Sequence, residues 1–486
     1  MLFNSLDFAI FLPLVFLLYW FVAQKNLKLQ NVLIVLASYF FYGWWDWRFL
    51  SLIIFSTVVD YFVGLKLRTE EKQSKRKVLL WTSIVVNLGF LGFFKYYNFF
   101  LENFVNAFSL FGMQVNANSL NIILPVGISF YTFQTLSYTI DVYKKKLEPT
   151  DDFIAFSAFV CFFPQLVAGP IERATNLLPQ FYNNRIFEYH KAVDGMRQIL
   201  WGLFKKVVIA DNSAEFANQI FNNSADMNGS TLFIGAIFFT FQIYGDFSGY
   251  SDIAIGTSRL FGFNLKQNFA TPYFSRDIAE FWRRWHISLS TWFRDYLYIP
   301  LGGSRGGIWM KVRNTFTIFL VSGFWHGANW TFIIWGALNA IYFLPLLLTN
   351  NNRKNLGVVA EGKLLPSFRE LFQIFSTFIL TIFAWIFFRA ESLNHAFEYV
   401  SSIFSKSLFT NPINDLWRVN TGFLIIHIIL CVLFLLIVEW FNRKSLHGLN
   451  LDFLENKYFR WLIYYSIIIL IFFMNSAQQE FIYFQF

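Results

Sequence analysis

Long stretches without a charged side chain constrain this sequence more than any other feature. Nine of them run for 17 to 20 residues, close to the roughly 20 residues with which an α-helix crosses a hydrocarbon core about 30 Å thick. A chain with this pattern is expected to fold with most of its helices inside a lipid bilayer. The stretches are residues 8–24, 29–45, 78–94, 121–140, 153–171, 229–245, 371–388, 419–438 and 461–479.

Two further segments extend this pattern. Residues 49–65 carry Asp60 as their one charge, and residues 314–352 are uncharged for 39 residues, about 58 Å as a helix and enough for a hairpin. Charged residues make up 14% of the 486 residues, whereas soluble proteins contain about 25%. We therefore predict an all-α polytopic membrane protein, with roughly ten to twelve transmembrane helices in one integrated bundle.

The distribution of Lys and Arg predicts the orientation of the chain, because cytoplasmic loops carry an excess of both. The segment KLRTEEKQSKRK at 66–77 contains six of them, which places it in the cytoplasm and the N-terminus outside. Residues 1–23 lack a basic start and a small-residue cleavage site, so we expect no cleaved signal peptide. The last predicted helix follows Arg443, Lys444, Lys457 and Arg460. It therefore runs outward, and both termini are expected to be extracytoplasmic.

One region does not fit a simple series of crossings. If residues 153–171 crossed the membrane, the basic stretch 172–206 would lie outside. Pro164 and the pair Gly169-Pro170 interrupt a helix there, so we predict a re-entrant segment covered by protein or by a water-filled cavity. The Asn-rich segment 211–228 is expected to be an extracytoplasmic loop.

The segment VSGFWHGANW at 321–330 places an ionisable residue deep in the long uncharged run. His326 lies 13 residues beyond Arg313, which is about 20 Å of helical rise and past the bilayer midplane. An ionisable side chain at that depth is costly and indicates a functional site. The alternative is a neutral imidazole that is hydrogen-bonded between helices. The neighbours expected to shape the site are Gly323, Trp325, Gly327 and Asn329.

The segment FWRRWHISLSTWFRDYLYIPLGGSRGG at 281–307 combines apolar side chains at helical spacing with an excess of basic residues, so we place it at the cytoplasmic face. One interpretation is an interfacial amphipathic helix with Trp anchors. The other is a cavity in which the phosphates of a cytosolic donor meet Arg283, Arg284 and Arg294. His286 is either a second catalytic residue or a packing residue.

Carboxylates occur beside another apolar crossing, in QIYGDFSGYSDIAIG at 242–256. Asp246 and Asp252 need partners there, so we predict a buried polar network in preference to a catalytic carboxylate. The six His show no metal-ligand spacing, and Cys161 and Cys431 lie in apolar runs, so we predict no metal site and no disulfide.

The last six residues are FIYFQF, although chain ends are usually polar and disordered. So many aromatic side chains are expected to pack against the protein rather than face water. The segment is either a hydrophobic anchor for the last helix or a functional element built around Tyr483.

Taken together, these segments resemble the membrane-bound O-acyltransferase family, and specifically its bacterial branch typified by the alginate O-acetyltransferase membrane subunit. The resemblance covers most of the chain. It rests on YGDFSGYSDIAIG, FWRRWHISLSTWFRDYLYIPLGG, SGFWHGANW and PQLVAGPI at 164–171. It implies a ring of transmembrane, re-entrant and interfacial helices around a central funnel, with a catalytic core at about residues 121–350 and an acyl-acceptor motif at 481–486.

The resemblance also implies roles for individual residues. The essential membrane-embedded His of the family corresponds to His326, and its other frequently cited His corresponds to His286. The ending resembles the F-x-Y-x-x-F motif of envelope-acylating systems, including the small partner subunit of teichoic-acid D-alanylation. In such systems the Tyr receives the acyl group as an ester, so the acceptor here would be Tyr483. Donor binding would involve Arg283, Arg284, Arg294, Trp325 and Asn329.

We therefore expect a bacterial inner-membrane enzyme that moves an acetyl or similar short acyl group outward for O-acylation of an envelope polysaccharide. The expected donor is acetyl-CoA or an acyl carrier thioester, and no permanently bound cofactor is expected. We expect a separate extracytoplasmic esterase-like subunit of the SGNH type as partner. The alternatives are direct acylation of a lipid or protein in the membrane, which would not need Tyr483, and a transporter that uses His326 as a proton relay.

Overall fold

The computed structural model describes residues 1–113, 119–413, 415–416, 422–474 and 479–484. Gln485 and Phe486 of the predicted acceptor motif lie outside the described residues. The described residues form helices joined by turns, with no β-strand among them, which confirms the prediction of an all-α protein. They divide into two compact units, Met1–Ala192 with Thr257–Lys266 and Val193–Gly256 with Gln267–Phe486. The prediction of one integrated domain stays a prediction.

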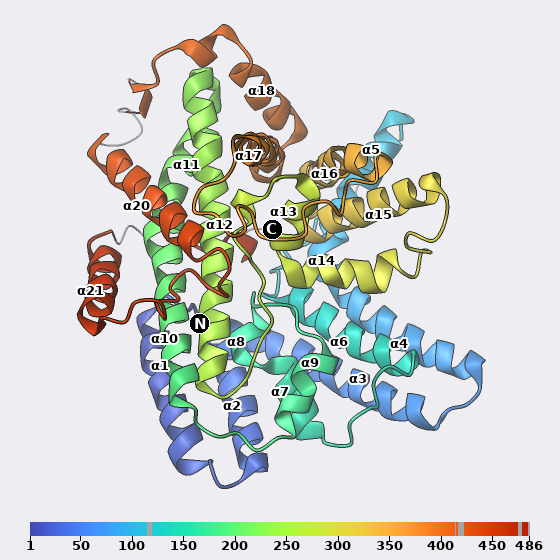
Figure 1. Cartoon of the computed structure of the whole chain (residues 1–486). Helices are drawn as coiled ribbons and strands as arrows, with labels where there is room; N and C mark the ends of the chain where they lie inside the picture. The colour runs from blue at the N-terminus through green and yellow to red at the C-terminus, as the bar shows by residue number, and fades with distance from the viewer. Residues whose placement is uncertain (114–118, 414, 417–421, 475–478, 485–486) are drawn as a thin grey trace. The chain divides into compact units, whose positions relative to one another are not determined.

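The first unit contains the N-terminal helices (Figure 1). Its α-helices are α1 (Leu6–Leu17), α2 (Leu27–Asp46), α3 (Leu50–Thr69), α4 (Gln73–Leu91), α5 (Tyr97–Leu110), α6 (Ile128–Tyr143), α7 (Phe153–Cys161), α8 (Phe163–Leu166) and α9 (Ala174–Leu177). Its π and 3-10 turns are η1 (Leu18–Val22), η2 (Trp47–Phe49), η3 (Gly92–Tyr96) and η4 (Leu178–Phe181).

Polar side chains hold three helices of the first unit together. The Asp60 carboxylate of α3 is fully buried and accepts hydrogen bonds from Ser83 (2.5 Å) and Asn87 (2.9 Å) of α4 and from Thr139 (3.3 Å) of α6. These donors satisfy a carboxylate that would otherwise be costly in an apolar surrounding.

The break predicted near Pro164 is present. Helix α7 ends at Cys161 and has only nine residues, about 14 Å of rise, which is too short to cross a bilayer. Phe162 leaves the helical conformation, and Pro164 lies in the first turn of α8. Residues 155–174 are buried, as a segment at membrane depth requires.

The second unit contains the remaining helices, except that α10 begins and α12 ends in the first unit. Its α-helices are α10 (Tyr189–Leu203), α11 (Asn212–Asn222), α12 (Gly229–Leu260), α13 (Ile278–Arg284), α14 (Ile287–Phe293), α15 (Ile308–His326), α16 (Trp330–Leu348), α17 (Phe368–Arg389), α18 (Leu393–Ile403), α20 (Gly422–Phe441) and α21 (Lys457–Phe473). Its π and 3-10 turns are η5 (Phe204–Asp211), η6 (Ser224–Asp226), η7 (Pro272–Phe274), η8 (Arg294–Tyr298), η9 (Lys406–Phe409) and η10 (Ile482–Phe484).

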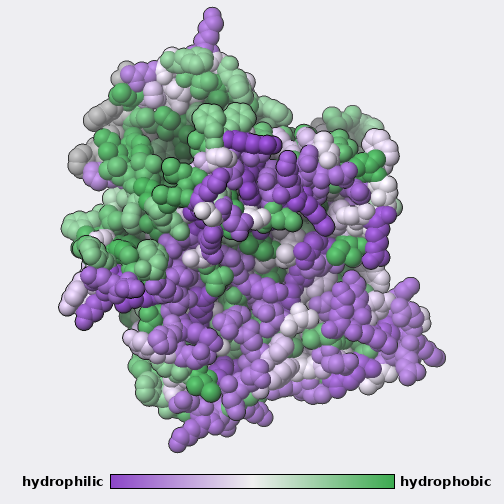
Figure 2. Space-filling model, in the orientation of Figure 1, coloured by the Kyte–Doolittle hydropathy of each residue, from purple (hydrophilic) through white to green (hydrophobic). Residues whose placement is uncertain are grey.

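The helices confirm a polytopic membrane protein. Among the described residues, five helical segments are long and apolar enough to cross a bilayer. They are Leu27–Thr69, Gln73–Leu110, Gly229–Leu260, Trp330–Leu348 and Phe368–Arg389. Figure 2 shows apolar surface over α20 and α21, where many large side chains are exposed, as expected for a surface that faces lipid. The count of ten to twelve transmembrane helices stays a prediction.

Two local expectations differ from the structure. The Asn-rich segment 211–228 was expected to be a loop, but it forms α11 and η6, because apolar residues such as Phe216 and Ile220 recur at helical spacing and are fully buried. The amphipathic segment from residue 281 is not one helix. It is broken at His286, which adopts a left-handed conformation with φ of 43° between α13 and α14.

The uncharged run 314–352 forms the predicted hairpin, in which α15 and α16 pack closely. Glycines make this approach possible: a Cβ atom on Gly336 would lie 2.3 Å from the Phe319 carbonyl oxygen, and one on Gly323 would lie 2.2 Å from that of Phe332. Small residues commonly allow such contact between membrane helices. The contact matters for function because α15 ends at His326.

We expect Gly336→Ala to lower the thermal stability of the purified protein. The added methyl group meets backbone, which cannot move aside as a side chain can, so a cost of about 1–3 kcal/mol is expected. Gly89→Ala on α4 is the matched control, because nothing lies within 4 Å of its added Cβ and Ala favours a helix. Thermal unfolding in detergent measures both, and equal midpoints for the two variants would contradict the close packing of α15 and α16.

Candidate functional site

The end of the α15–α16 hairpin places His326. Helix α15 stops at His326 because Gly327 is extended, and a Cβ atom there would lie 2.1 Å from the Phe332 ring. Asn329 begins α16 by accepting a hydrogen bond from the Thr331 N–H (3.0 Å), and it donates one to the Glu391 carbonyl (3.0 Å). Asn329 therefore holds the hairpin in shape.

Aromatic rings surround the His326 imidazole, which is 3% exposed. They come from α15, α16, α17 and the tail segment, which we define as residues 479–484. The ring centroids lie 4.9 Å from Trp325, 5.0 Å from Trp335, 5.2 Å from Phe388 and 5.5 Å from Tyr483. The imidazole therefore lies in a largely aromatic surrounding.

The tail segment lies against α12 (Figure 1). The Ile482 N–H donates a hydrogen bond to the Asp246 carboxylate at 2.6 Å, and the Tyr483 ring lies 4.5 Å from the Phe247 ring. Phe481 and Ile482 are buried, while Tyr483 is partly buried. The aromatic ending is thus packed inside the second unit, with its tyrosine beside His326.

Buried ion pairs lie next to the tail segment. We call Lys206, Asp211 and Asp246 the Lys206 cluster: the ammonium lies 2.7 Å from Asp211 and 2.8 Å from Asp246. A second pair joins Lys205 to Asp252 at 2.5 Å. The prediction that Asp246 and Asp252 belong to a buried polar network is confirmed.

His286 lies near this site. It is 1% exposed, its Nδ1 lies 3.3 Å from Asn268 Oδ1, and burial lowers its pKa to about 3. The Phe247 ring contacts both His286 (4.6 Å) and Tyr483 (4.5 Å). His286 is therefore packed in the wall of the site, and its catalytic role stays a prediction.

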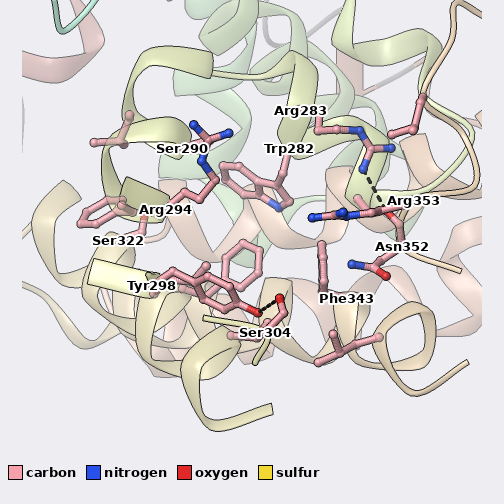
Figure 3. A pocket seen from close by; sticks show the side chains of 18 residues that line it. Trp282, Arg283, Ser290, Arg294, Tyr298, Ser304, Ser322, Phe343, Asn352 and Arg353 are labelled. Atoms are coloured by element: carbon pink, nitrogen blue, oxygen red, sulfur yellow. Dashed lines mark hydrogen bonds between the residues drawn. The ribbon is translucent and has the colours of Figure 1, made fainter. Parts of the chain in front are cut away.

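A cavity of about 320 Å³ lies between α13–α14 and the α15–α16 hairpin. Figure 3 shows Arg283 and Arg353 on one side of Trp282 and Arg294 on the other. Three cationic side chains around an apolar floor suit a ligand with anionic and apolar parts.

The three predicted arginines have different surroundings. Arg283 lines the cavity and donates to the carbonyls of Asn352 (2.9 Å) and Asn355 (2.7 Å). Arg294 also lines it, with 59% of its side chain exposed. Arg284 does not line it, because its guanidinium pairs with the buried Glu280 at 3.0 Å.

Arg353 lines the cavity but was not predicted from the sequence. It follows the long uncharged run and looks there like an ordinary cytoplasmic loop charge. The signal that could have found it is its position directly after α16, the partner helix of α15.

The cavity extends toward His326. Ser322 lines it and lies four residues before His326 on α15, which is about 6 Å of helical rise. The Trp282 ring of the cavity contacts Trp335 (5.7 Å), which in turn contacts His326. The structure thus brings His326, Trp325 and Tyr483 together, and places Arg283 and Arg294 in the neighbouring cavity.

Comparison with known proteins adds independent evidence. A family model described as the membrane-bound O-acyltransferase family matches residues 149–360, which include His326 and the arginines of the cavity. A Pseudomonas aeruginosa protein described as "Probable alginate O-acetylase" is 40% identical over 453 residues, covering 92% of this chain and 82% of that protein.

Two further relatives have related printed names. The peptidoglycan O-acetyltransferase of Helicobacter pylori is 34% identical and covers 100% of this chain and 98% of its own length. The teichoic acid D-alanyltransferase of Streptococcus thermophilus is 27% identical over 60% of this chain and 75% of its own length. These similarities confirm the resemblance indicated by the sequence motifs.

The different surroundings of the arginines predict different effects of substitution. Arg284→Gln removes a charged partner from Glu280, which is 1% exposed, so a loss of about 2 kcal/mol in stability is expected. Arg294→Gln removes an exposed ion pair with Asp295 and should change stability by less than about 1 kcal/mol. Thermal unfolding in detergent compares the two, and a larger effect at Arg294 would refute the assignment.

Proposed function

This chain belongs to the membrane-bound O-acyltransferase family, and from that membership we propose that it transfers an acetyl group from a cytosolic thioester to its own Tyr483. The chain is an O-acyltransferase embedded in the membrane. The finer proposal is carried by one observation, the contact between the rings of His326 and Tyr483 at 5.5 Å. A tyrosine held beside the imidazole of the family's membrane-embedded segment is in place to accept an acyl group.

The proposed step forms one bond and breaks another. The neutral His326 imidazole takes the phenol proton, Tyr483 Oη bonds to the thioester carbonyl carbon, and the C–S bond breaks. The imidazolium returns the proton to the departing thiolate, so the products are an acetyl-tyrosine ester and a free thiol. A base is required because burial, with a further effect of Asp246, raises the pKa of Tyr483 well above its ordinary value of about 10.

We propose that the cavity binds the donor, with acetyl-CoA as the donor expected. Arg283, Arg294 and Arg353 would meet its phosphates, while Ser322 and Phe319 lie on the side toward His326. The carrier bears several charges and cannot cross hydrocarbon at low cost, whereas an acetyl group is small and neutral. A reaction centre between the two compartments therefore allows the acyl group to cross without its carrier.

The names of the relatives support the proposed final acceptor, and the lack of a nucleophile elbow among the described residues supports the proposed partner. Relatives are named for O-acetylation of alginate and of peptidoglycan, so we propose an extracytoplasmic polysaccharide of the cell envelope as final acceptor. The enzyme would lie in the bacterial inner membrane with both termini outside. An extracytoplasmic SGNH-type partner would take the acetyl group from Tyr483 and pass it to the polymer, since the described residues form no β-strand and therefore no strand–turn–helix nucleophile elbow.

The central test is the acetyl ester on Tyr483. Incubation with labelled acetyl-CoA should label the wild-type C-terminal peptide, whereas Tyr483→Phe should give none and His326→Ala should slow labelling by at least about 100-fold. Mass spectrometry of the peptide measures the ester. Label on the Tyr483→Phe peptide, or full labelling of the His326→Ala protein, would contradict the relay; acylation of a lipid without Tyr483 would support the direct alternative.

The donor proposal has its own test. Arg353→Gln should raise the KM for acetyl-CoA by about tenfold, because a charge-assisted contact to phosphate is lost. S-acetyl-pantetheine lacks those phosphates, so its KM should not change. Arg369→Gln, at an exposed position on α17 that does not line the cavity, is the control. An equal rise for both donors would show that the arginine does not contact phosphate.

A further inference from the structure

We propose that the Lys206 cluster is a docking site for the main chain of the tail segment, and that it fixes which tail residue lies at His326. Lys206 and Asp246 would then be positioning residues that act through Tyr483. The consequence for acyl transfer depends on the function proposed above, whereas the docking itself does not.

The cluster contacts backbone atoms at two points of the tail segment. The Lys206 ammonium donates to the Gln479 carbonyl at 3.1 Å, and Asp246 accepts from the Ile482 N–H at 2.6 Å. Neither contact uses a tail side chain. Recognition of this kind is insensitive to the side chains at 479 and 482, and together with the ring contacts of Phe481 and Tyr483 it fixes the position of the chain along α12.

The Lys206 ammonium donates hydrogen bonds to the Asp211 carboxylate and the Gln479 carbonyl, and it forms an ion pair with Asp246. All three charged side chains are at most 8% exposed, so an ammonium proton without an acceptor would be costly there. Withdrawal of the tail would remove one of these acceptors, and the cluster therefore favours the docked tail.

One face of α12 supplies a contact for each of three consecutive tail residues. The Tyr250 ring contacts Phe481 (4.8 Å), Asp246 accepts from Ile482, and the Phe247 ring contacts Tyr483 (4.5 Å). These α12 positions are related by i, i+1 and i+4, so they share a face of the helix. A shift of the tail by one residue would break the hydrogen bond and remove Tyr483 from His326.

The neighbouring ion pair is a natural control. Lys205 and Asp252 come from the same two helical segments as Lys206 and Asp246, and both are buried. The Gln198 side chain donates a hydrogen bond to Asp252 (2.7 Å), and the Lys205 ammonium lies 5.5 Å from the centre of the Tyr244 ring. None of these belongs to the tail segment, so a substitution there perturbs the same helices without touching the tail.

The first experiment compares Asp246→Asn with Asp252→Asn in the full-length protein reconstituted in lipid nanodiscs. Hydrogen–deuterium exchange of the peptide containing Ile482 should become at least about tenfold faster in Asp246→Asn, because a neutral acceptor binds the N–H more weakly. Asp252→Asn should leave that exchange within about twofold of wild type. Equal exchange in the two variants overturns the proposal.

A second pair of variants removes the N–H itself. Ile482→Pro lacks the donor, yet proline suits the first position of a helical turn such as η10. Ile482→Ala keeps the donor while losing more of the buried side chain. Exchange in the rest of the tail peptide should rise in the proline variant and stay near wild type in the alanine variant. The reverse order would show that side-chain packing, and not the cluster, holds the tail.

Measurements of acyl transfer distinguish a loss of Tyr483 positioning from general damage to the protein structure. In Asp246→Asn, single-turnover acylation of Tyr483 should fall at least about tenfold, while transfer to added 4-methylphenol should persist, because His326 remains in place. Loss of both reactions would show structural damage and overturn the positioning role. If wild-type Tyr483 is never acylated, the proposed function fails, while the exchange results still decide whether the cluster holds the tail.

Discussion

A polypeptide backbone that enters an apolar helical bundle must find hydrogen-bond partners inside it, and this constraint shapes the functional part of the protein. The tail segment meets it with charged groups, the carboxylate of Asp246 and the ammonium of Lys206. Side chains alone could anchor an aromatic ending in many positions, since aromatic packing is tolerant of small shifts. Two backbone contacts combined with the ring contacts of Phe481 and Tyr483 favour one position, and in that position Tyr483 lies beside His326.

The cavity and the surroundings of His326 differ in their exposure to water, and this difference suits them to the separate tasks proposed for them. The cavity is lined by cations such as Arg294, which water can reach, so it can attract and release a charged carrier. The surroundings of His326 are aromatic and buried, which suits the proposed role of its imidazole as a proton acceptor. Ser322 lines the cavity four residues before His326, and Trp335 contacts both Trp282 of the cavity and His326.

Much of the fold followed from the sequence, because charge-free stretches and interrupting prolines act locally. The hairpin of α15 and α16 and the break before Pro164 were both predictable in this way. The left-handed conformation of His286 was not, because helical spacing continues through that position. The helix at 212–222 was missed because its many Asn residues hide an apolar face.

Some functional residues were likewise predictable from the sequence and others were not. The motif around His326 and the aromatic ending indicated Tyr483, but nothing local links Asp246 to Ile482, which lie 236 residues apart. Adjacent arginines illustrate the difficulty: Arg283 faces the cavity and Arg284 pairs with Glu280, since neighbours on a helix point in different directions. Charge and spacing alone do not distinguish them.

The adjacent lysines of η5 show how an ion pair that stabilises the helical bundle can also position the tail segment. Lys205 and Lys206 pair with Asp252 and Asp246, which are six residues apart on α12, about 9 Å of helical rise. Both pairs join the same two helical segments, so either one stabilises the bundle. An ammonium has three donors, however, and the pair nearer the tail uses one of them for the Gln479 carbonyl. The Lys205–Asp252 ion pair also joins these segments. The Lys206–Gln479 contact can therefore form or break with the tail while the two segments stay joined.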